Sequence, residues 1–373
     1  MKQKIIINGI PLLSQLTGIG RYCYEISKYI EKNKIYDATF HYGYNSKNLI
    51  HPTTQESVKQ AKSFIVSISL IKKIVKKLIA YYYKLFGSTY DLYWEPSFIP
   101  QSYIKSKKTI TTVHDFSFIL HRDFHTKERI KYFEENFFQN IYRSDIIITG
   151  SEFSKQEILD RLDFKEENVR VIYHGVRHDV FKKIDDIKLD FDLPEKFIFS
   201  VGSIEPRKNL VGLLGAYNNL SNEIKQEYKL VIAGFKGWEN KEIMQIIEKN
   251  KDFITYLGYI SDEELAAVYN KASCFVYPSF YEGFGLPPLE AMACGTPVVC
   301  SNVSSLPEVG GDAVVYCDPY SVEDIKNKIE LVLLDEGQQK ELSLKGLEQA
   351  QKFTWEKSAQ EHIKIFNELL ETI

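Results

Sequence analysis

Residues 279–297 read SFYEGFGLPPLEAMACGTP, and this segment carries more structural information than any other part of the chain. Just before it, Cys274–Tyr277 is a short apolar run with the length and composition of a buried strand. Good helix formers follow Pro288, and Gly295 with Pro297 marks the end of that helix. The segment therefore predicts a strand, a glycine-containing turn and a helix N-terminus, where free backbone N–H groups and the helix dipole favour an anion.

Two carboxylates in this segment, Glu282 and Glu290, are separated by seven residues. Carboxylates repel phosphate, so we expect them to accept hydrogen bonds from the hydroxyl groups of a sugar or a ribose. Their spacing places them at opposite ends of a turn and a helix, which argues against the acid–base pair of a glycosidase. An anion-binding turn flanked by two hydroxyl acceptors indicates a nucleotide-sugar site.

The composition is that of a soluble globular protein, with 44% hydrophobic and 26% charged residues among 373, and this length favours two domains. The formal net charge of −3 gives no indication of nucleic-acid binding. Because no apolar run is long enough to span a membrane and the N-terminus does not read as a signal peptide, we expect a cytoplasmic enzyme. The five cysteines are scattered without a C-x-x-C pair, which predicts reduced thiols.

Short apolar strands alternate with helical stretches, which predicts a parallel α/β sheet in each half of the chain. The expected strands are Lys4–Asn8, Thr109–Val113, Asp145–Thr149, Val169–Tyr173, Phe197–Val201, Lys229–Ala233, Cys274–Tyr277, Pro297–Cys300 and Ala313–Tyr316. A charged, aperiodic stretch at 182–188 separates the halves. We therefore expect domains at 1–178 and 179–354, followed within 355–373 by an amphipathic helix from Trp355 to Leu370.

The segment Val58–Phe86 contains seven lysines and no acidic residue. As a helix it would carry Ile71, Ile74, Val75, Leu78 and Ile79 on one face and Lys72, Lys73, Lys76 and Lys77 on the other. This pattern is typical of a helix that lies on an anionic membrane, and it also fits a domain helix with a solvated basic face. The unrelieved positive charge, in a chain that is acidic overall, favours the membrane.

Arg207 and Lys208 follow another predicted strand, after the loop residues Gly202 and Ser203. Ligands of open parallel sheets bind at the carboxyl ends of the strands, where this pair would lie. Two cations beside a helix N-terminus can neutralise a diphosphate, including the charge that develops on it as it departs. The alternative is a solvent-exposed basic pair, and the segment 279–297 favours the diphosphate site.

Three further motifs carry less chemical information. Gly18 and Gly20 lack the third glycine of the dinucleotide fingerprint and indicate either a loop that approaches a ligand or only the start of a helix. His114 ends a predicted strand and is a candidate for binding a sugar hydroxyl, although a lone histidine is more often structural. Asp190 and Asp192 match a metal–diphosphate pattern but lie in the expected linker, so no metal is assigned.

Together these motifs resemble the retaining glycosyltransferases of family 4, over nearly the whole chain. The matching segments occur in the family's order and are residues 18–22, 113–117, 151–155, 202–209 and 282–290. The combination is most similar to the bacterial mannosyltransferases of polysaccharide and lipopolysaccharide O-antigen assembly. It implies the α/β fold named GT-B, in which two Rossmann-like parallel-sheet domains face a central cleft. The N-terminal domain would bind the acceptor, the C-terminal domain the nucleotide sugar, and the C-terminal helix would cross back to the first domain.

The resemblance also implies roles for single residues. Glu290 would bind the ribose and Glu282 the transferred sugar. Arg207 and Lys208 would bind the diphosphate, and His114 would contact the sugar from the N-terminal domain. The other implied donor contacts are Gly18, Gly20, Gly202, Ser203, Gly283, Phe284, Gly285 and Leu286, with Gly258, Tyr259 and Ile260 near the base. Ser203 stands where many members carry an arginine, which leaves Arg207 and Lys208 as the main cations.

We therefore expect a hexosyltransferase that moves a sugar from a nucleotide diphospho-sugar to a glycan or lipid-linked acceptor, with retention and without a metal or other cofactor. The branch resemblance favours mannose from GDP-mannose; UDP-linked glucosyl, galactosyl or N-acetylhexosaminyl groups are the alternative. The sequence gives no signal for the catalysts of an epimerase or the pyridoxal site of a phosphorylase. A non-catalytic membrane scaffold would not need Glu282, Lys208 and His114. The expected location is the cytoplasmic face of the membrane, held through Val58–Phe86.

Overall fold

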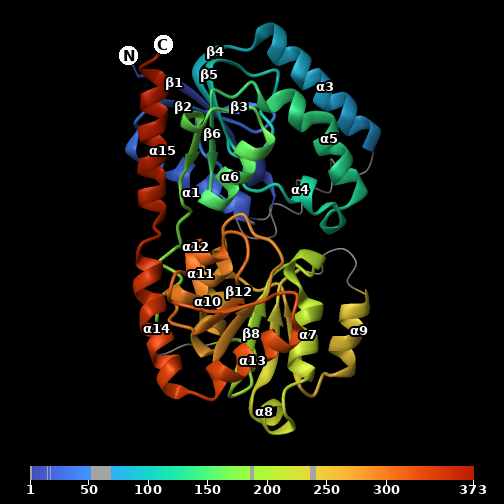
Figure 1. Ribbon diagram of the computed structural model, residues 1–373. Helices are drawn as coiled ribbons and strands as arrows, with labels where there is room; N and C mark the ends of the chain where they lie inside the picture. Colours follow the sequence, from blue (N-terminus) through green and yellow to red (C-terminus); the bar gives the residue numbers. More distant parts are fainter. Residues whose placement is uncertain (1, 15, 17, 52–68, 185–188, 236–240) are drawn as a thin grey trace.

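The computed structural model describes residues 2–14, 16, 18–51, 69–184, 189–235 and 241–373. They form two α/β domains, one above the other in Figure 1. The two-domain fold that the sequence predicts is confirmed. Residues 58–68 of the basic segment and 185–188 of the charged linker lie outside the described residues. The described part of the chain contains no helix whose length and hydropathy would let it cross a lipid bilayer.

The N-terminal domain is built on one sheet of seven strands. The strands are β1 (Lys4–Asn8), β2 (Asp37–His41), β3 (Asn45–Ser46), β4 (Thr89–Glu95), β5 (Lys105–Thr112), β6 (Ile146–Thr149) and β7 (Val169–Val171). Their order is β3-β2-β1-β4-β5-β6-β7, and only the pairing of β2 with β3 is antiparallel among those described. The helices are α1 (Gly18–Asn33), α3 (Ser69–Phe86), α4 (Ser117–Leu120), α5 (Lys127–Ile141) and α6 (Glu152–Arg161), with 3-10 turns η1 (Ile10–Leu13), η2 (Arg122–Phe124) and η3 (Glu166–Asn168).

The C-terminal domain is built on a parallel sheet with the order β10-β9-β8-β11-β12-β13. Its strands are β8 (Phe197–Val201), β9 (Lys229–Ala233), β10 (Ile254–Gly258), β11 (Cys274–Tyr277), β12 (Val298–Ser301) and β13 (Val315–Cys317). The helices are α7 (Leu210–Asn218), α8 (Asn222–Glu227), α9 (Lys241–Lys249), α10 (Asp262–Lys271), α11 (Leu286–Ala293), α12 (Leu306–Gly310), α13 (Val322–Leu333), α14 (Glu336–Gln351) and α15 (Trp355–Leu370), with the 3-10 turn η4 (Pro206–Lys208). Neighbouring residues of β8 pack into different clusters, Phe197 and Phe199 into one and Ile198 into the other, so both faces of the sheet are covered.

Strands β2, β3, β4 and β10 are absent from the sequence prediction, whereas β1, β8, β9 and β11 have the predicted bounds. In β4 the charged residues Asp91 and Glu95 interrupt the apolar pattern. Glu95 is nevertheless buried, because Asn8, the Tyr93 hydroxyl and the Ser97 amide donate hydrogen bonds of 2.6–3.0 Å to its carboxylate. The five cysteines are free and buried, as expected.

The C-terminal helix crosses back to the N-terminal domain, as predicted. Helix α14 packs on α11, and α15 packs on α1, so the two helices run along one side of both domains (Figure 1). Phe366 and Leu369 of α15 belong to the hydrophobic cluster that also contains Ile7 and Tyr22. The core of the first domain therefore includes side chains from the far end of the sequence.

The two segments that connect the domains lie side by side. Val176 pairs with Thr354, and its amide donates a hydrogen bond to the Phe353 carbonyl at 3.2 Å. At Gly175 a Cβ would overlap the backbone of Trp355, so the close approach of the two segments requires glycine there.

A directed chain of buried hydrogen bonds connects α15 with the first sheet. The indole of Trp94 can only donate, and it donates to Thr112 Oγ1 at 3.1 Å. Thr112 then donates to the Tyr22 hydroxyl at 2.8 Å, and Tyr22 donates to His362 Nε2. The opposite nitrogen of His362 donates to the Ser358 carbonyl at 2.7 Å, which completes a chain that requires a neutral imidazole.

Three neutral histidines lie around Tyr22. His114, His174 and His362 have ring centroids within 5.4 Å of the Tyr22 ring centroid. Burial lowers the pKa of each one, to about 4 for His362. Protonation of this cluster therefore opposes folding.

We expect acid to destabilise the protein through these histidines. Their unfolded pKa is near 6.5, so their contribution to stability is complete above that pH and is lost as the pH falls through their lowered folded pKa values. His362→Gln removes one side chain that takes up a proton when the protein unfolds. The substitution should therefore flatten the pH dependence of the free energy of unfolding by about 1.4 kcal/mol per pH unit between pH 4 and 6.5. Urea unfolding at a series of pH values measures this slope.

The control for this measurement is His51→Gln, which changes an exposed histidine and should keep the wild-type slope. A wild-type slope in His362→Gln would contradict the prediction.

Candidate active site

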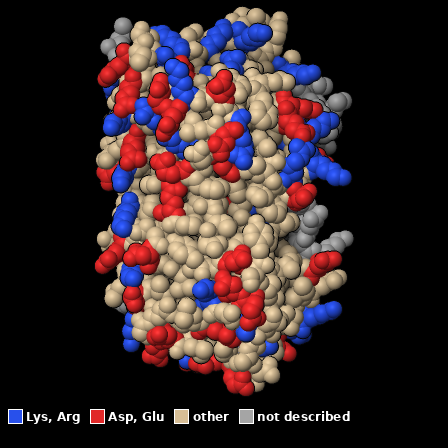
Figure 2. Space-filling view, viewed as in Figure 1, with Lys and Arg blue, Asp and Glu red and all other residues tan. Residues whose placement is uncertain are grey.

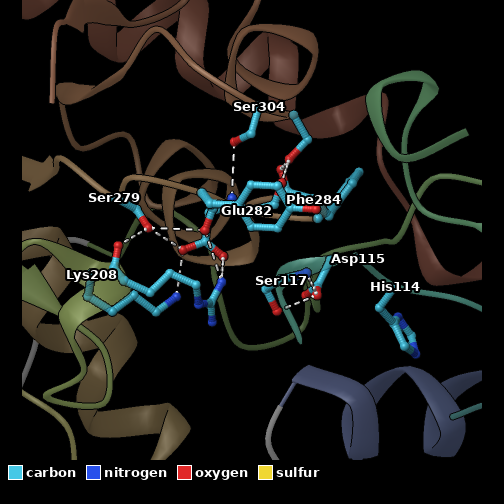
Figure 3. A network of polar contacts seen from close by, with 12 residues as sticks. His114, Asp115, Ser117, Lys208, Ser279, Glu282, Phe284 and Ser304 are labelled. Carbon is cyan, nitrogen blue, oxygen red and sulfur yellow. Dashed lines mark hydrogen bonds and ion pairs between the residues drawn. The ribbon is translucent and has the colours of Figure 1, made fainter. Parts of the chain in front are cut away.

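The carboxylate of Glu282 lies buried between the two cations of η4 (Figure 3). It accepts hydrogen bonds from Arg207 Nη1 and Lys208 Nζ, one on each oxygen and both at 2.7 Å. Glu282 follows β11 and the cations follow β8. Because β8 and β11 are neighbours in a parallel sheet, the loops after their carboxyl ends meet. The structure thus brings together three of the four predicted catalytic residues.

Hydroxyl groups complete the surroundings of this carboxylate. Tyr277 and Ser279 donate to Oε1 of Glu282 at 2.9 and 2.7 Å. Ser304 accepts a hydrogen bond from the Glu282 backbone amide at 3.0 Å (Figure 3). Four side-chain donors on one carboxylate favour its ionised form and fix its orientation.

Two cations contact one carboxylate in this cluster, and the carboxylates of Asp115 and Glu205 also act on Arg207. Burial raises the pKa of Glu282, but Arg207 and Lys208 outweigh this effect and lower the pKa to about 2. Burial and the neighbouring guanidinium lower the pKa of Lys208. Burial also lowers the pKa of Arg207, but Glu282, together with Asp115 and Glu205, more than compensates and the net shift is upward. Two adjacent buried cations suit an anionic ligand.

The turn at residues 283–286 leads from Glu282 into α11. Ser305 Oγ donates hydrogen bonds to two carbonyl groups of the loop, at 2.9 and 2.7 Å, and so fixes its shape. Pro287 and Pro288 have no N–H groups. The amides at 284–286 are therefore the ones that this helix start offers to an anion.

The same loop joins the two domains. Gly283 packs so closely against the His114 carbonyl that a Cβ would overlap it, which requires glycine. Ser151 Oγ donates to the Gly283 carbonyl at 2.9 Å, and the Tyr281 hydroxyl donates to Glu157. The candidate site is therefore closed on one side by the N-terminal domain.

His114 lies apart from the Glu282 cluster (Figure 3). Its Nε2 donates to the Pro96 carbonyl at 2.8 Å, and its ring packs edge-on against Tyr22 with 5.1 Å between centroids. Only Nδ1 remains for a ligand, and because burial lowers the pKa of His114, this nitrogen is an acceptor. Its contact with a sugar stays a prediction.

Glu290 is half-buried on α11 and accepts a hydrogen bond from the Tyr269 hydroxyl at 3.4 Å. Burial, together with the nearby carboxylate of Asp262, raises the pKa of Glu290 to about 8. The two glutamates of the segment thus have opposite environments, one held by cations and the other with a single long hydrogen bond. Binding of ribose hydroxyls by Glu290 stays a prediction.

An ion pair that the sequence does not predict crosses between the domains beside Glu290. Asp262, at the start of α10, contacts Arg21 of α1, and it also lies 3.0 Å from Arg177 in the connecting segment. Arg21 directly follows Gly20 in the motif that the sequence singles out. Its partner could not be identified, because Asp262 is distant in sequence and looks like an ordinary first-turn helix residue.

The predicted glycines lie around these groups. A Cβ on Gly18 would be 3.7 Å from Leu286 Cδ1, so the start of α1 meets the start of α11, whereas Gly20 faces its own domain at Pro11. The Lys208 side chain passes over Gly202, 3.5 Å from the position of a Cβ.

The remaining predicted residues lie further along the sheet or before it. Gly258 ends β10, and the exposed ring of Tyr259 stacks on Phe235 with 4.6 Å between centroids. Ile260 packs against the core and Ser203 is half-buried in the loop after β8. Asp190 and Asp192 are exposed in the segment before β8, as expected for solvated charges.

Comparison with known proteins gives two family models in succession. The model described as Glycosyltransferase Family 4 matches residues 16–180, and that described as Glycosyl transferases group 1 matches residues 181–361. The O-antigen chain mannosyltransferase B of Escherichia coli is 32% identical over 97% of this chain and 99% of its own length. The serotype-specific mannosyltransferase WbdA of the same species is 34% identical over 71% of this chain, which corresponds to 34% of the relative.

Solved structures share the fold over the whole chain. Sucrose-phosphate synthase from Thermosynechococcus elongatus has a TM-score of 0.72 at 21% identity, with complete coverage of both chains. Anabaena HepE in complex with UDP-glucose has a TM-score of 0.67 at 15% identity and covers 98% of this chain and 100% of its own.

We expect Glu282→Gln to leave the positive charges of Arg207 and Lys208 without the carboxylate that contacts both of them. Because both buried cations lose this partner, the substitution should lower the free energy of unfolding by about 3 kcal/mol. Pyrophosphate should then raise the melting temperature of Glu282→Gln more than that of the wild type, because it can occupy the place between Arg207 and Lys208. Thermal unfolding with increasing pyrophosphate measures both effects.

Glu290→Gln is the matched control, because Glu290 forms no ion pair with either cation. Its response to pyrophosphate should equal that of the wild type. An equal response of all three proteins would show that Glu282 does not balance the anion site.

Proposed function

The chain belongs to the family 4 glycosyltransferases, and from this we propose that it transfers mannose from GDP-mannose to a growing glycan with retention of configuration. The similarity to the O-antigen chain mannosyltransferase B of Escherichia coli over 97% of the chain supports this donor sugar and the glycan acceptor. The observation that carries the proposal is the cluster of Arg207, Lys208 and Glu282 at the carboxyl ends of β8 and β11. It combines positive charge for a diphosphate with a carboxylate for sugar hydroxyls.

In the proposed reaction the bond between sugar C1 and the phosphate oxygen breaks, and a bond from C1 to the acceptor oxygen forms. The proton of the acceptor hydroxyl passes to the departing phosphate oxygen. Arg207 and Lys208 stabilise the negative charge that grows on this oxygen in an oxocarbenium-like transition state. The proposal includes no metal, because the two side chains supply the positive charge that the leaving group needs.

Retention in this proposal uses no enzyme nucleophile. Glu282 is the carboxylate next to the cations, but its pKa of about 2 and its four side-chain donors make it a weak nucleophile and a weak base. We assign it to the hydroxyl groups of the transferred sugar. Departure and attack then take place on the same face of the sugar.

Replacing Lys208→Ala tests the role of the cations. The positive charge of Lys208 should interact more strongly with the departing diphosphate in the transition state than with the bound donor. We therefore expect kcat for transfer from GDP-mannose to fall about 100- to 1000-fold, with a smaller change in GDP affinity. Lys196→Ala is the control, since Lys196 pairs with Glu227 on the surface, and it should keep wild-type rates. Unchanged turnover in Lys208→Ala would contradict the assignment.

The donor itself is tested by calorimetry with GDP, UDP and ADP, followed by rate measurements with GDP-mannose and the UDP-sugars. The proposal expects GDP to bind most tightly and the product to have the anomeric configuration of the donor by NMR. Tighter binding of UDP would move the proposal to a UDP-sugar donor. No binding of any nucleotide would favour the non-catalytic scaffold.

We further propose that α3 holds the enzyme on an anionic membrane surface. Among its described side chains, Leu78, Tyr82, Leu85 and Phe86 are 50–72% exposed. Ala80 and the ring of Tyr83 face the domain, where they pack against a small hydrophobic cluster. The described part of α3 thus leaves apolar side chains uncovered, although Ile79 is half-buried.

The charge distribution supports the same surface. Lys77 and Lys84 flank the exposed apolar side chains, and α3 carries no acidic residue. Lys and Arg side chains gather at the end of the N-terminal domain where α3 lies, whereas acidic side chains are frequent at the opposite end (Figure 2). Apolar side chains with adjacent lysines are typical of helices that lie in the headgroup region of anionic lipids.

We expect Leu85→Glu to prevent binding to vesicles of phosphatidylcholine and phosphatidylglycerol, because it places a negative charge within the exposed apolar face. Leu334→Glu, which changes a similarly exposed leucine in the C-terminal domain, should float like the wild type. Flotation with and without phosphatidylglycerol measures both. Equal recovery of wild-type protein with and without the anionic lipid would contradict the membrane proposal.

A further inference from the structure

Four aromatic rings form a row across the boundary between the domains. His121 and Phe124 of the N-terminal domain lie 4.9 Å apart with nearly parallel planes. Phe280 of the C-terminal domain follows at 6.2 Å from Phe124, and Tyr320 at 5.0 Å from Phe280. The interplanar angles are between 10° and 30°, so the four rings share one general orientation. We call them the ring row.

The ring row is anchored to the loops of the candidate active site. The Phe280 amide donates to the Arg207 carbonyl at 2.9 Å. Asn209 Nδ2 donates to the Pro319 carbonyl at 2.7 Å, which ties the residue before Tyr320 to the start of α7. The Tyr320 amide also donates to Asp318 at 2.9 Å. The backbone beside both C-terminal rings is therefore fixed next to the two cations.

Polar groups line the N-terminal end of the ring row. Ser117 Oγ donates to Asp115 at 2.6 Å, so His125 Nε2 donates to Ser117 at 2.8 Å. His125 also lines a cavity of about 610 Å³ between η2 and α5, whose other walls include Arg122 and Asp123. Charged and hydroxyl-binding side chains thus flank Phe124 in the sequence and line a cavity on the N-terminal domain.

The exposure of Tyr320 is difficult to explain by packing alone. Its ring is 70% exposed, although its backbone is held by hydrogen bonds and its neighbour Phe280 is half-buried. A ring needed only to join the domains would be covered by both of them. An anchored aromatic side chain that is open to solvent can receive the apolar face of a ligand.

We propose that Tyr320, at the exposed end of the ring row, is a subsite for a sugar unit beyond the one that reacts, and that the acceptor is therefore an oligosaccharide. The C–H groups on one face of a hexose are apolar and weakly positive, so they pack on the negative face of an aromatic ring. The hydroxyl groups at the edge of the same sugar bind polar side chains. The inference rests on the proposed transferase function and specifies its second substrate.

Equilibrium binding of α-linked manno-oligosaccharides of increasing length, measured by ligand-observed NMR on the full chain with GDP, tests this subsite. Wild-type affinity should increase with length. Tyr320→Ala should weaken binding of the longest oligosaccharide about three- to tenfold, the range expected for loss of one stacked ring. Tyr320→Phe keeps the ring and should retain the affinity.

Tyr142→Ala is the matched control, because Tyr142 is also exposed and stacks on Phe164 at 5.5 Å, but it lies beyond the other end of α5. It should bind like the wild type. Affinity that is independent of length, absence of binding, or equal binding by Tyr320→Ala and Tyr142→Ala would overturn the subsite. Hydrolysis of GDP-mannose needs no acceptor chain and is measured separately on the same protein. Hydrolysis without length-dependent binding would refute the subsite alone, whereas absence of hydrolysis would refute the proposed function.

Discussion

The ion cluster of Glu282 with Arg207 and Lys208 is the interaction on which the rest of the site depends. A carboxylate can be buried there only because two cations and two hydroxyl groups compensate for lost water. The cluster requires β8 and β11 to be neighbours, so that the loops after both strands reach the same point. The strand order of the C-terminal sheet is therefore a condition for the chemistry.

The loop after β11 has a second task, because its backbone also forms the contact between the domains. Gly283 touches the His114 carbonyl, while the adjacent Glu282 side chain turns toward the cations. On the other side of the cleft, Arg21 reaches Asp262 beside Glu290. Both glutamates thus lie next to a point where the domains touch. The affinity for a ligand that binds both of them would therefore depend on the relative position of the domains.

The sequence predicts best what depends on local pattern. Strands such as β8 and β11 are continuous apolar runs, and α15 has the predicted bounds Trp355–Leu370. The meeting of Arg207 with Glu282 follows from the general rule for parallel sheets. By contrast, β4 was not predicted, because charged residues such as the buried Glu95 do not fit an apolar strand pattern. The Arg21–Asp262 contact was not predicted, because it joins residues far apart in sequence. Periodicity also predicted an apolar and a basic face for α3, but only the tertiary structure shows that Leu78 is exposed whereas Ile79 is half-buried.

The return of α15 to the first domain has a consequence for the order of folding during synthesis. Domains generally fold in the order in which they leave the ribosome. Here the first core contains Phe366 and Leu369, which are translated after the entire second sheet. The core of the N-terminal domain, with Ile7 and Tyr22, therefore stays incompletely covered until the C-terminal domain and α15 have been synthesised. The first domain thus completes its folding last, after the second domain has been synthesised.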